Sequence, residues 1–141
     1  MFDSMISQTR QVVTVGCSRG ELEGLVAGAG RVVAALNALQ ARCATEIEGL
    51  DDGGLNSKVV LREAGRMSTR AANRVARTAA GLAEMPKLAE SLANGAITVE
   101  HAEVAVGAAA KTSPQQVDDQ LSELAEGSSV DVFTEQSRRW V

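Results

Sequence analysis

Aromatic residues are nearly absent from this sequence, which has two Phe, one Trp and no Tyr among 141 residues. A core without aromatic side chains has to be built from Ala, Leu, Val, Ile and Met, and such residues favour helices over strands. We therefore expect an all-α fold and not a mostly β one. A chain of this length is expected to form one domain that buries roughly two-thirds of its unfolded surface.

Histidine and cysteine are also scarce, with one His and two Cys. His101 precedes Val104 and Ala105 at helical spacing, so we expect a packed, hydrogen-bonded side chain and not a catalytic base. Cys17 and Cys43 are far apart in the sequence and are expected to be reduced thiols. Because no His, Cys and carboxylate residues gather at ligand spacing, the sequence predicts a non-catalytic chain without metal ion, cofactor or small-molecule substrate.

Long apolar runs are missing as well. No stretch approaches the ~20 consecutive apolar residues that a membrane crossing requires, and Asp3 stands where a secretory signal would carry positive charge. We therefore expect a cytoplasmic protein without a membrane partner. Gly28 and Gly30 lack the preceding strand of a phosphate-binding loop and are expected to permit a close helix crossing.

What the sequence does contain is a series of helix starts and stops. Ser18, with Glu21 at capping-box spacing, begins a long amphipathic helix that ends at the turn 51–54. The apolar residues of this helix recur every three or four positions and are Leu22, Leu25, Ala29, Val32, Leu36, Leu39, Cys43 and Leu50, with Ile47 one place off. Six shorter helices follow, at about 57–64, 68–84, 86–94, 98–111, 113–127 and 128–141.

The expected architecture is thus a helical bundle with one long N-terminal helix and about six shorter helices. Residues 1–17 are expected to be an N-terminal segment, and residues 18–141 a single helical domain. The last helix is still open at Trp140, without a Gly, Pro or polar tail. This open end predicts a fragment of a longer protein.

Charge is distributed unevenly along the chain. Residues 58–77 contain six basic and one acidic residue, a balance of +5, whereas the rest contains eight basic and seventeen acidic residues, or −9, which together give −4. The six basic residues are Lys58, Arg62, Arg66, Arg70, Arg74 and Arg77. The last four follow steps of four, four and three, which keeps them on one helix face.

Arginines in this arrangement can follow phosphates, and Thr69 and Asn73 can add hydrogen bonds. DNA is therefore a candidate partner, and the scarcity of aromatic residues argues against stacking on single strands. Two other interpretations stay open. The strip can be a solvated cationic face that pairs with acidic helices of the same domain, or part of a helix-turn-helix unit around Gly65, although Arg74 falls where such units usually bury an apolar residue.

Three stretches together resemble a known family. They are residues 66–75 (RMSTRAANRV), 82–86 (LAEMP) and 92–102 (LANGAITVEHA). A basic Ser-led helix, a Leu-Pro junction and an Ala-rich helix ending in Gly, followed by a Ser/Thr-capped helix with a His-Ala pair, are similar to the domain of unknown function 222, also called the thirteen-E-twelve repeat family. The resemblance covers most of the chain from the long helix onward.

Members of that family often carry this helical region before an HNH nuclease domain and occur mainly in high-GC Gram-positive bacteria. The resemblance implies an association with DNA and with an HNH-type endonuclease. It carries no nuclease residue onto this chain, because an HNH motif needs two histidines about a divalent metal and only His101 is present. The resemblance therefore implies a non-catalytic N-terminal module, truncated before an HNH domain or existing without one. The alternative is a protein–protein interaction or oligomerisation module that pairs through its long helix with a nuclease chain or another copy.

Overall fold

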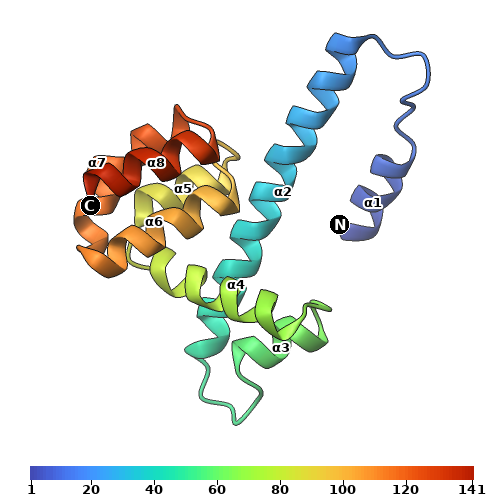
Figure 1. Ribbon diagram of the computed structural model, residues 1–141. Coiled ribbons are helices and arrows are strands. Elements are labelled where there is room, and N and C mark those ends of the chain that lie inside the picture. The colour runs from blue at the N-terminus through green and yellow to red at the C-terminus, as the bar shows by residue number, and fades with distance from the viewer.

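The computed structural model describes all 141 residues and confirms the all-α prediction, with eight helices and no strand (Figure 1). The helices are α1 (Phe2–Arg10), α2 (Arg19–Glu48), α3 (Ser57–Glu63), α4 (Thr69–Leu82), α5 (Pro86–Ala93), α6 (Val99–Lys111), α7 (Pro114–Glu126) and α8 (Val130–Trp140). Helices α2 to α8 are the one long and six shorter helices that the sequence predicts.

Polar side chains at the N-caps explain where most of these helices begin. In six helices the N-cap side chain accepts a hydrogen bond from the backbone N–H three residues later, which satisfies one of the free donors of the first turn. The capping residues are Ser18, Asn56, Ser68, Thr98, Ser113 and Ser129. In α5, which has no capping side chain of this kind, Pro86 occupies the first turn.

The core lies in the C-terminal part of the molecule, where α5 to α8 pack together against α4 and the second half of α2 (Figure 1). Its largest fully buried side chains include Leu88, Leu92, Leu121 and Phe133. A second, smaller cluster joins α2, α3 and α4 around Leu61. We call residues 34–141, which hold every buried residue of the chain, the body.

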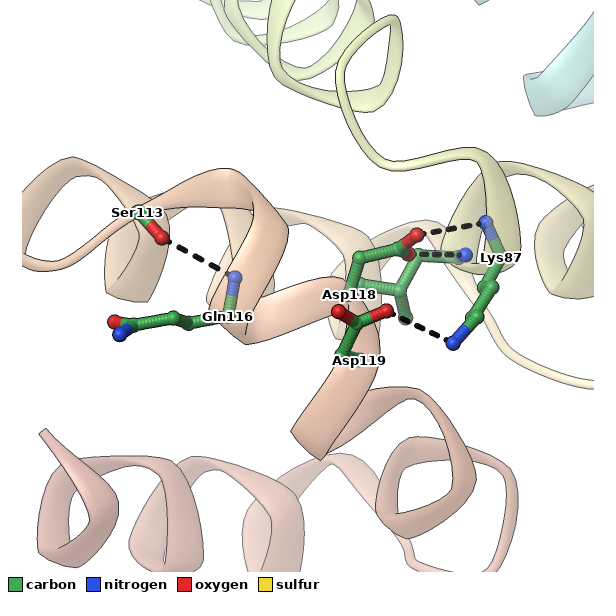
Figure 2. Close-up of polar contacts among 6 residues, drawn as sticks. Lys87, Ser113, Gln116, Asp118 and Asp119 are labelled. Atoms are coloured by element: carbon green, nitrogen blue, oxygen red, sulfur yellow. Dashed lines mark hydrogen bonds and ion pairs between the residues drawn. The ribbon is translucent and has the colours of Figure 1, made fainter.

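Two buried polar side chains fix helices of the body to one another. The carboxylate of Asp118 on α7 accepts hydrogen bonds from the backbone N–H groups of Lys87 and Leu88 at the start of α5, at 3.0 and 2.9 Å (Figure 2). His101 accepts from the backbone N–H of Thr98, contacts the carbonyl oxygen of Ser128 at 2.7 Å and packs on the Phe133 ring. The prediction of a packed, hydrogen-bonded histidine is therefore confirmed.

The N-terminal third of the chain differs from the prediction in one respect. Residues 1–17 were expected only as a segment, but they contain the helix α1. The sequence gives no start for this helix, because Met1 provides no capping side chain, and no neighbouring element buries any of its residues. We call residues 1–33, in which no residue is buried, the arm.

The face by which α2 meets the body is not its apolar stripe. The buried residues of α2 are Ala34, Ala38, Ala41 and Ala44. Leu36 lies two positions from Ala34, which is roughly 200° around a helix of 3.6 residues per turn. The stripe that the sequence predicts therefore points away from α4 to α8, with its second half beside α3, and small alanine side chains make the close contact with the body instead.

By length and composition alone, α2 is the one helix that is long and apolar enough to cross a membrane. It lies near the N-terminus, and its second half packs on the body. Core helices of proteins without any membrane span pass the same test. Cytoplasmic location and the absence of a membrane partner thus stay predictions.

Candidate nucleic-acid interface

An open groove of about 990 Å³ lies where α4 passes the start of α3 and the end of α2. Its lining is mostly polar, and four of its ten residues are basic. The lining residues are Glu48, Ser57, Lys58, Thr69, Arg70, Asn73, Arg74, Ala76, Arg77 and Ala80. We call this feature the basic groove.

The arginines reach the groove because α4 is amphipathic. Its buried residues include Ala72, Ala79 and Leu82, which pack in the two core clusters. Arg70, Arg74 and Arg77 lie on other sides of the helix and are exposed. Short buried residues bring α4 close to its neighbours, so the long guanidinium side chains stand out from the surface.

Lys58 reaches the same groove through a different contact. The side chain of Glu48, the last residue of α2, accepts hydrogen bonds from both the backbone N–H and the hydroxyl of Ser57 at the first turn of α3. These two hydrogen bonds, and more weakly the charge of Lys58, hold the pKa of Glu48 below its ordinary value. The start of α3 is thereby fixed to the end of α2, with Lys58 beside α4.

The basic side chains of the groove have no ion-pair partner within the chain. The three ion pairs of the structure join Lys87 to Asp119 and Arg138 and Arg139 to Glu135, all outside the groove. Four basic residues face one carboxylate, Glu48, so the lining carries a net charge of +3. The structure therefore does not show the cationic face paired with acidic helices of its own domain.

The structure brings together four of the six basic residues that the sequence singles out. Lys58, Arg70, Arg74 and Arg77 line the groove, as do Thr69 and Asn73. Arg62 and Arg66 are exposed but do not line it.

Arg66 has φ of 57°, the left-handed conformation that the sequence suggests for the neighbouring Gly65. Gly65 is needed at its own position because a Cβ atom there would lie 2.5 Å from the carbonyl oxygen of Leu61. This turn takes Arg66 out of the arginine row, although its spacing of four fits that row. Arg74 is exposed in the groove, which weakens the helix-turn-helix interpretation further.

Sequence reasoning missed two polar residues of the groove, Glu48 and Ser57. Each looks like an ordinary helix-end residue, and no motif joins them across the intervening turn. Elsewhere in the chain, no three His, Cys, Asp or Glu side chains gather into a cluster that would hold a metal ion.

Comparison of the chain with protein-family models, with curated proteins and with solved structures finds no match. The resemblance to the domain of unknown function 222 therefore stays a prediction that depends on the three sequence stretches. A function for the groove has to be inferred from its own charge and geometry.

Proposed function

We propose that this chain is a non-catalytic helical module that contacts the phosphates of duplex DNA through the basic groove, in association with an HNH-type endonuclease. The observation that carries the proposal is the row of exposed, unpaired Arg70, Arg74 and Arg77, with Lys58 opposite, in one open groove. Arginines without an ion-pair partner attract anions and form bidentate hydrogen bonds with phosphate oxygens.

The spacing of the row suits a nucleic-acid backbone. Arg70 and Arg77 are separated by about 10 Å along the axis of α4, at 1.5 Å per residue. A DNA strand presents one phosphate about every 3.4 Å of its axis, so about three phosphates lie within the length of the row. The three arginines can thus each meet a phosphate of one strand, and Lys58, from α3 on the other side of the groove, can meet a fourth.

Duplex DNA fits the groove better than a single strand does. Proteins that hold single strands without sequence preference stack bases on aromatic side chains, and the groove has none. A contact made through phosphates alone does not depend on the base sequence. The association with a nuclease rests on the family resemblance and not on the groove.

Binding to a fluorescent 20-base-pair duplex at several salt concentrations tests the proposal. With four phosphate contacts, we expect the logarithm of the binding constant to fall against the logarithm of salt concentration with a slope of about −3.6. This slope corresponds to a loss of affinity of about 100-fold between 50 and 200 mM salt. Duplexes of different sequence should bind alike.

A matched pair of variants identifies the surface. The Arg70→Glu/Arg74→Glu chain should lose most of the binding and have a much flatter slope, because two contacts become repulsive. Arg138→Glu/Arg139→Glu on α8 changes the net charge by the same amount outside the groove and should change little. Equal losses in both variants would show that only the total charge matters, and no binding at low salt would exclude the proposed function.

A further inference from the structure

We propose that the arm is a dimerisation element, in which α1 and the first half of α2 pack antiparallel against the same elements of a second copy of this chain. The proposal is independent of the DNA contact and starts from the surface area. The chain exposes 9330 Å², whereas a compact monomer of 14.7 kDa exposes about 6,900 Å². The excess, about 2,400 Å², exceeds the roughly 800 Å² that each partner contributes to a stable interface.

The arm contributes to this excess, because the first half of α2 extends away from the body, while α1 runs back towards the middle of α2 (Figure 1). Large apolar side chains are exposed along its part of α2, with Val26 at 75%, Val33 at 54% and Val32 at 48%. Leu22 and Leu25 lie beside them on the apolar stripe and are also exposed. Single exposed apolar residues are ordinary, but a continuous stripe over about three helical turns is typical of an interaction surface.

The stripe continues into a hollow on the body. An apolar groove of about 690 Å³ runs along α2 and α3, and Leu36, Leu39, Cys43 and Ile47 of the stripe line it. Phe2 of α1 lies at the same groove. The exposed stripe and this groove form one surface along nearly the whole length of α2, on the side opposite Ala34 and Ala38, whereas Ala44 lines the groove itself.

The charges of the arm favour a second copy as the occupant. The arm has three basic and three acidic residues and no net charge, so two arms do not repel each other. On α2, Arg19 is followed by Glu21 and Glu23, and Arg31 comes ten residues after Glu21. The Cβ of Arg31 faces Gly95 of the body, and its side chain is exposed. An antiparallel pair centred near Val26 brings Arg31 of each copy level with Glu21 of the other, whereas a parallel pair would bring like charges level. A two-fold symmetric interface uses the same patch on both copies, so it would bring Glu21 and Arg31 together twice.

One glycine of the arm agrees with a close helix contact. The sequence predicts a close helix crossing at Gly28 and Gly30, but a Cβ atom on either would meet nothing within 4 Å, so no such crossing forms inside the monomer. Gly28 lies next to the stripe, whereas Gly20, five whole turns before Ala38, lies on the alanine face. A helix of a second copy can therefore approach the backbone closely at Gly28.

A membrane is the less suitable occupant for the same surface. Although α2 is long and apolar enough to cross a membrane, Arg31 lies in the middle of its apolar stretch 24–41, where a charged side chain is costly inside a bilayer. The second half of this stretch contains Ala34, Ala38 and Ala41, which are buried against the body. Binding of the arm to lipid is therefore an outcome of the test that would overturn the proposal.

Sedimentation velocity of the intact chain between 1 and 100 µM measures its oligomeric state. We expect a dimer, and the Leu25→Glu/Val32→Glu chain is expected to weaken it more than about 100-fold, because each charge is placed in an apolar interface. Val132→Glu, at an equally exposed valine on α8, is the matched control and should stay dimeric. Both variants should keep the helix content and unfolding midpoint of the body, since these side chains are exposed. A monomer at 100 µM, or a dimer unaffected by Leu25→Glu/Val32→Glu, would overturn the proposal.

A charge exchange tests the antiparallel orientation. Glu21→Arg and Arg31→Glu chains should each dimerise about tenfold more weakly, because attraction becomes repulsion at both symmetry-related pairs. Mixed in equal amounts, they should form a heterodimer as tight as the unchanged dimer. Failure of the mixture to recover would refute the antiparallel pairing. If the unchanged chain formed no dimer but floated with phosphatidylcholine vesicles, the stripe would be assigned to a lipid surface instead.

Discussion

In the body most of the large apolar side chains are buried or half-buried, whereas in the arm most side chains of the same kinds are exposed to solvent. The two phenylalanines show the difference most directly, since Phe133 on α8 is 0% exposed and Phe2 on α1 is 48% exposed. Both lie on helices of similar length with an apolar face. Helical periodicity thus identifies an apolar face in each region, but only in the body does the chain itself provide the element that covers it.

Truncation of each phenylalanine should give the largest contrast between the two regions. Phe133→Ala is expected to lower the free energy of unfolding by about 3–5 kcal/mol, because it removes a fully buried ring and leaves a cavity. Phe2→Ala is expected to change it by less than about 0.5 kcal/mol, as at other exposed positions. Urea denaturation followed by circular dichroism, at a concentration where the chain is monomeric, measures both. Similar losses for the two variants would mean that the arm is packed as tightly as the body.

Two neighbouring aspartates test whether the loss of a buried polar contact costs more stability than the loss of an exposed one. Asp118→Asn should lower the free energy of unfolding by about 2 kcal/mol, because one of the two backbone N–H groups at the start of α5 loses its charged acceptor. Asp119→Asn removes only the exposed ion pair with Lys87 (Figure 2) and should cost less than about 1 kcal/mol. The same denaturation measurement compares them, and equal costs would show that the buried contact has no special weight.

Two glycines inside helices should respond in opposite directions to the same substitution. In Gly81→Ala the new Cβ would lie 2.5 Å from a γ-carbon of Val106, and the overpacking is expected to cost about 1–3 kcal/mol. In Gly24→Ala nothing lies within 4 Å of the new atom, so the helix should gain about 1 kcal/mol of local stability.

Thermal unfolding reports the loss at Gly81, and the helical signal at low protein concentration reports the gain at Gly24. The two readouts are needed because the arm can fray without unfolding the body. A lower unfolding temperature in the Gly24→Ala chain would place this part of α2 in a packed environment and contradict its exposure. Weaker dimerisation of the same chain would place Gly24 in the contact between copies.

Local rules were sufficient for most of the fold. Ser18, Ser68, Thr98 and Ser113 begin helices where the sequence places them, because a cap is a contact between residues three apart and needs no tertiary information. The start of α1 was missed because it has no cap. The side of α2 that packs on the body could not be predicted in this way, because periodicity marks the large residues of the stripe, whereas the body buries alanines on another face of the helix.

The candidate site follows the same division between local and tertiary information. Spacing along α4 predicted the row of Arg70, Arg74 and Arg77, because these residues share one helix. The position of Lys58 beside them depends on the contact between Glu48 and Ser57, which belong to different helices and are joined by no motif. The exclusion of Arg66 depends on a single backbone angle in the turn before α4.

The smallest expected effect is a pH dependence of the contact between Glu48 and Ser57, which lies in the body at the end of α2. Hydrogen bonds from Ser57, and then the charge of Lys58, lower the pKa of Glu48 from its ordinary value of 4.5. A carboxyl group with a lowered pKa in the folded state stabilises that state at pH values above 4.5, and this contribution is lost as the pH falls through the lowered pKa. Near neutral pH, Glu48 stays ionised and its stabilising contribution should not change with pH. In acid this contribution is lost, and we expect the start of α3 to loosen and Lys58 to leave the groove.

NMR titration of the Glu48 side chain measures this effect in the unchanged chain and in two variants of its partner. Ser57→Ala removes the hydroxyl donor, which is the largest cause of the shift, and should raise the pKa of Glu48 towards 4.5. Ser57→Thr keeps both donors and should leave the pKa low. If the pKa were the same in all three chains, Ser57 would not hold Glu48, and Lys58 would have to reach the groove by another contact. If Ser57→Ala both raised the pKa of Glu48 and made the salt dependence of DNA binding flatter, this small contact would be connected to the proposed function. The flatter slope would mean that the phosphate contact of Lys58 is lost.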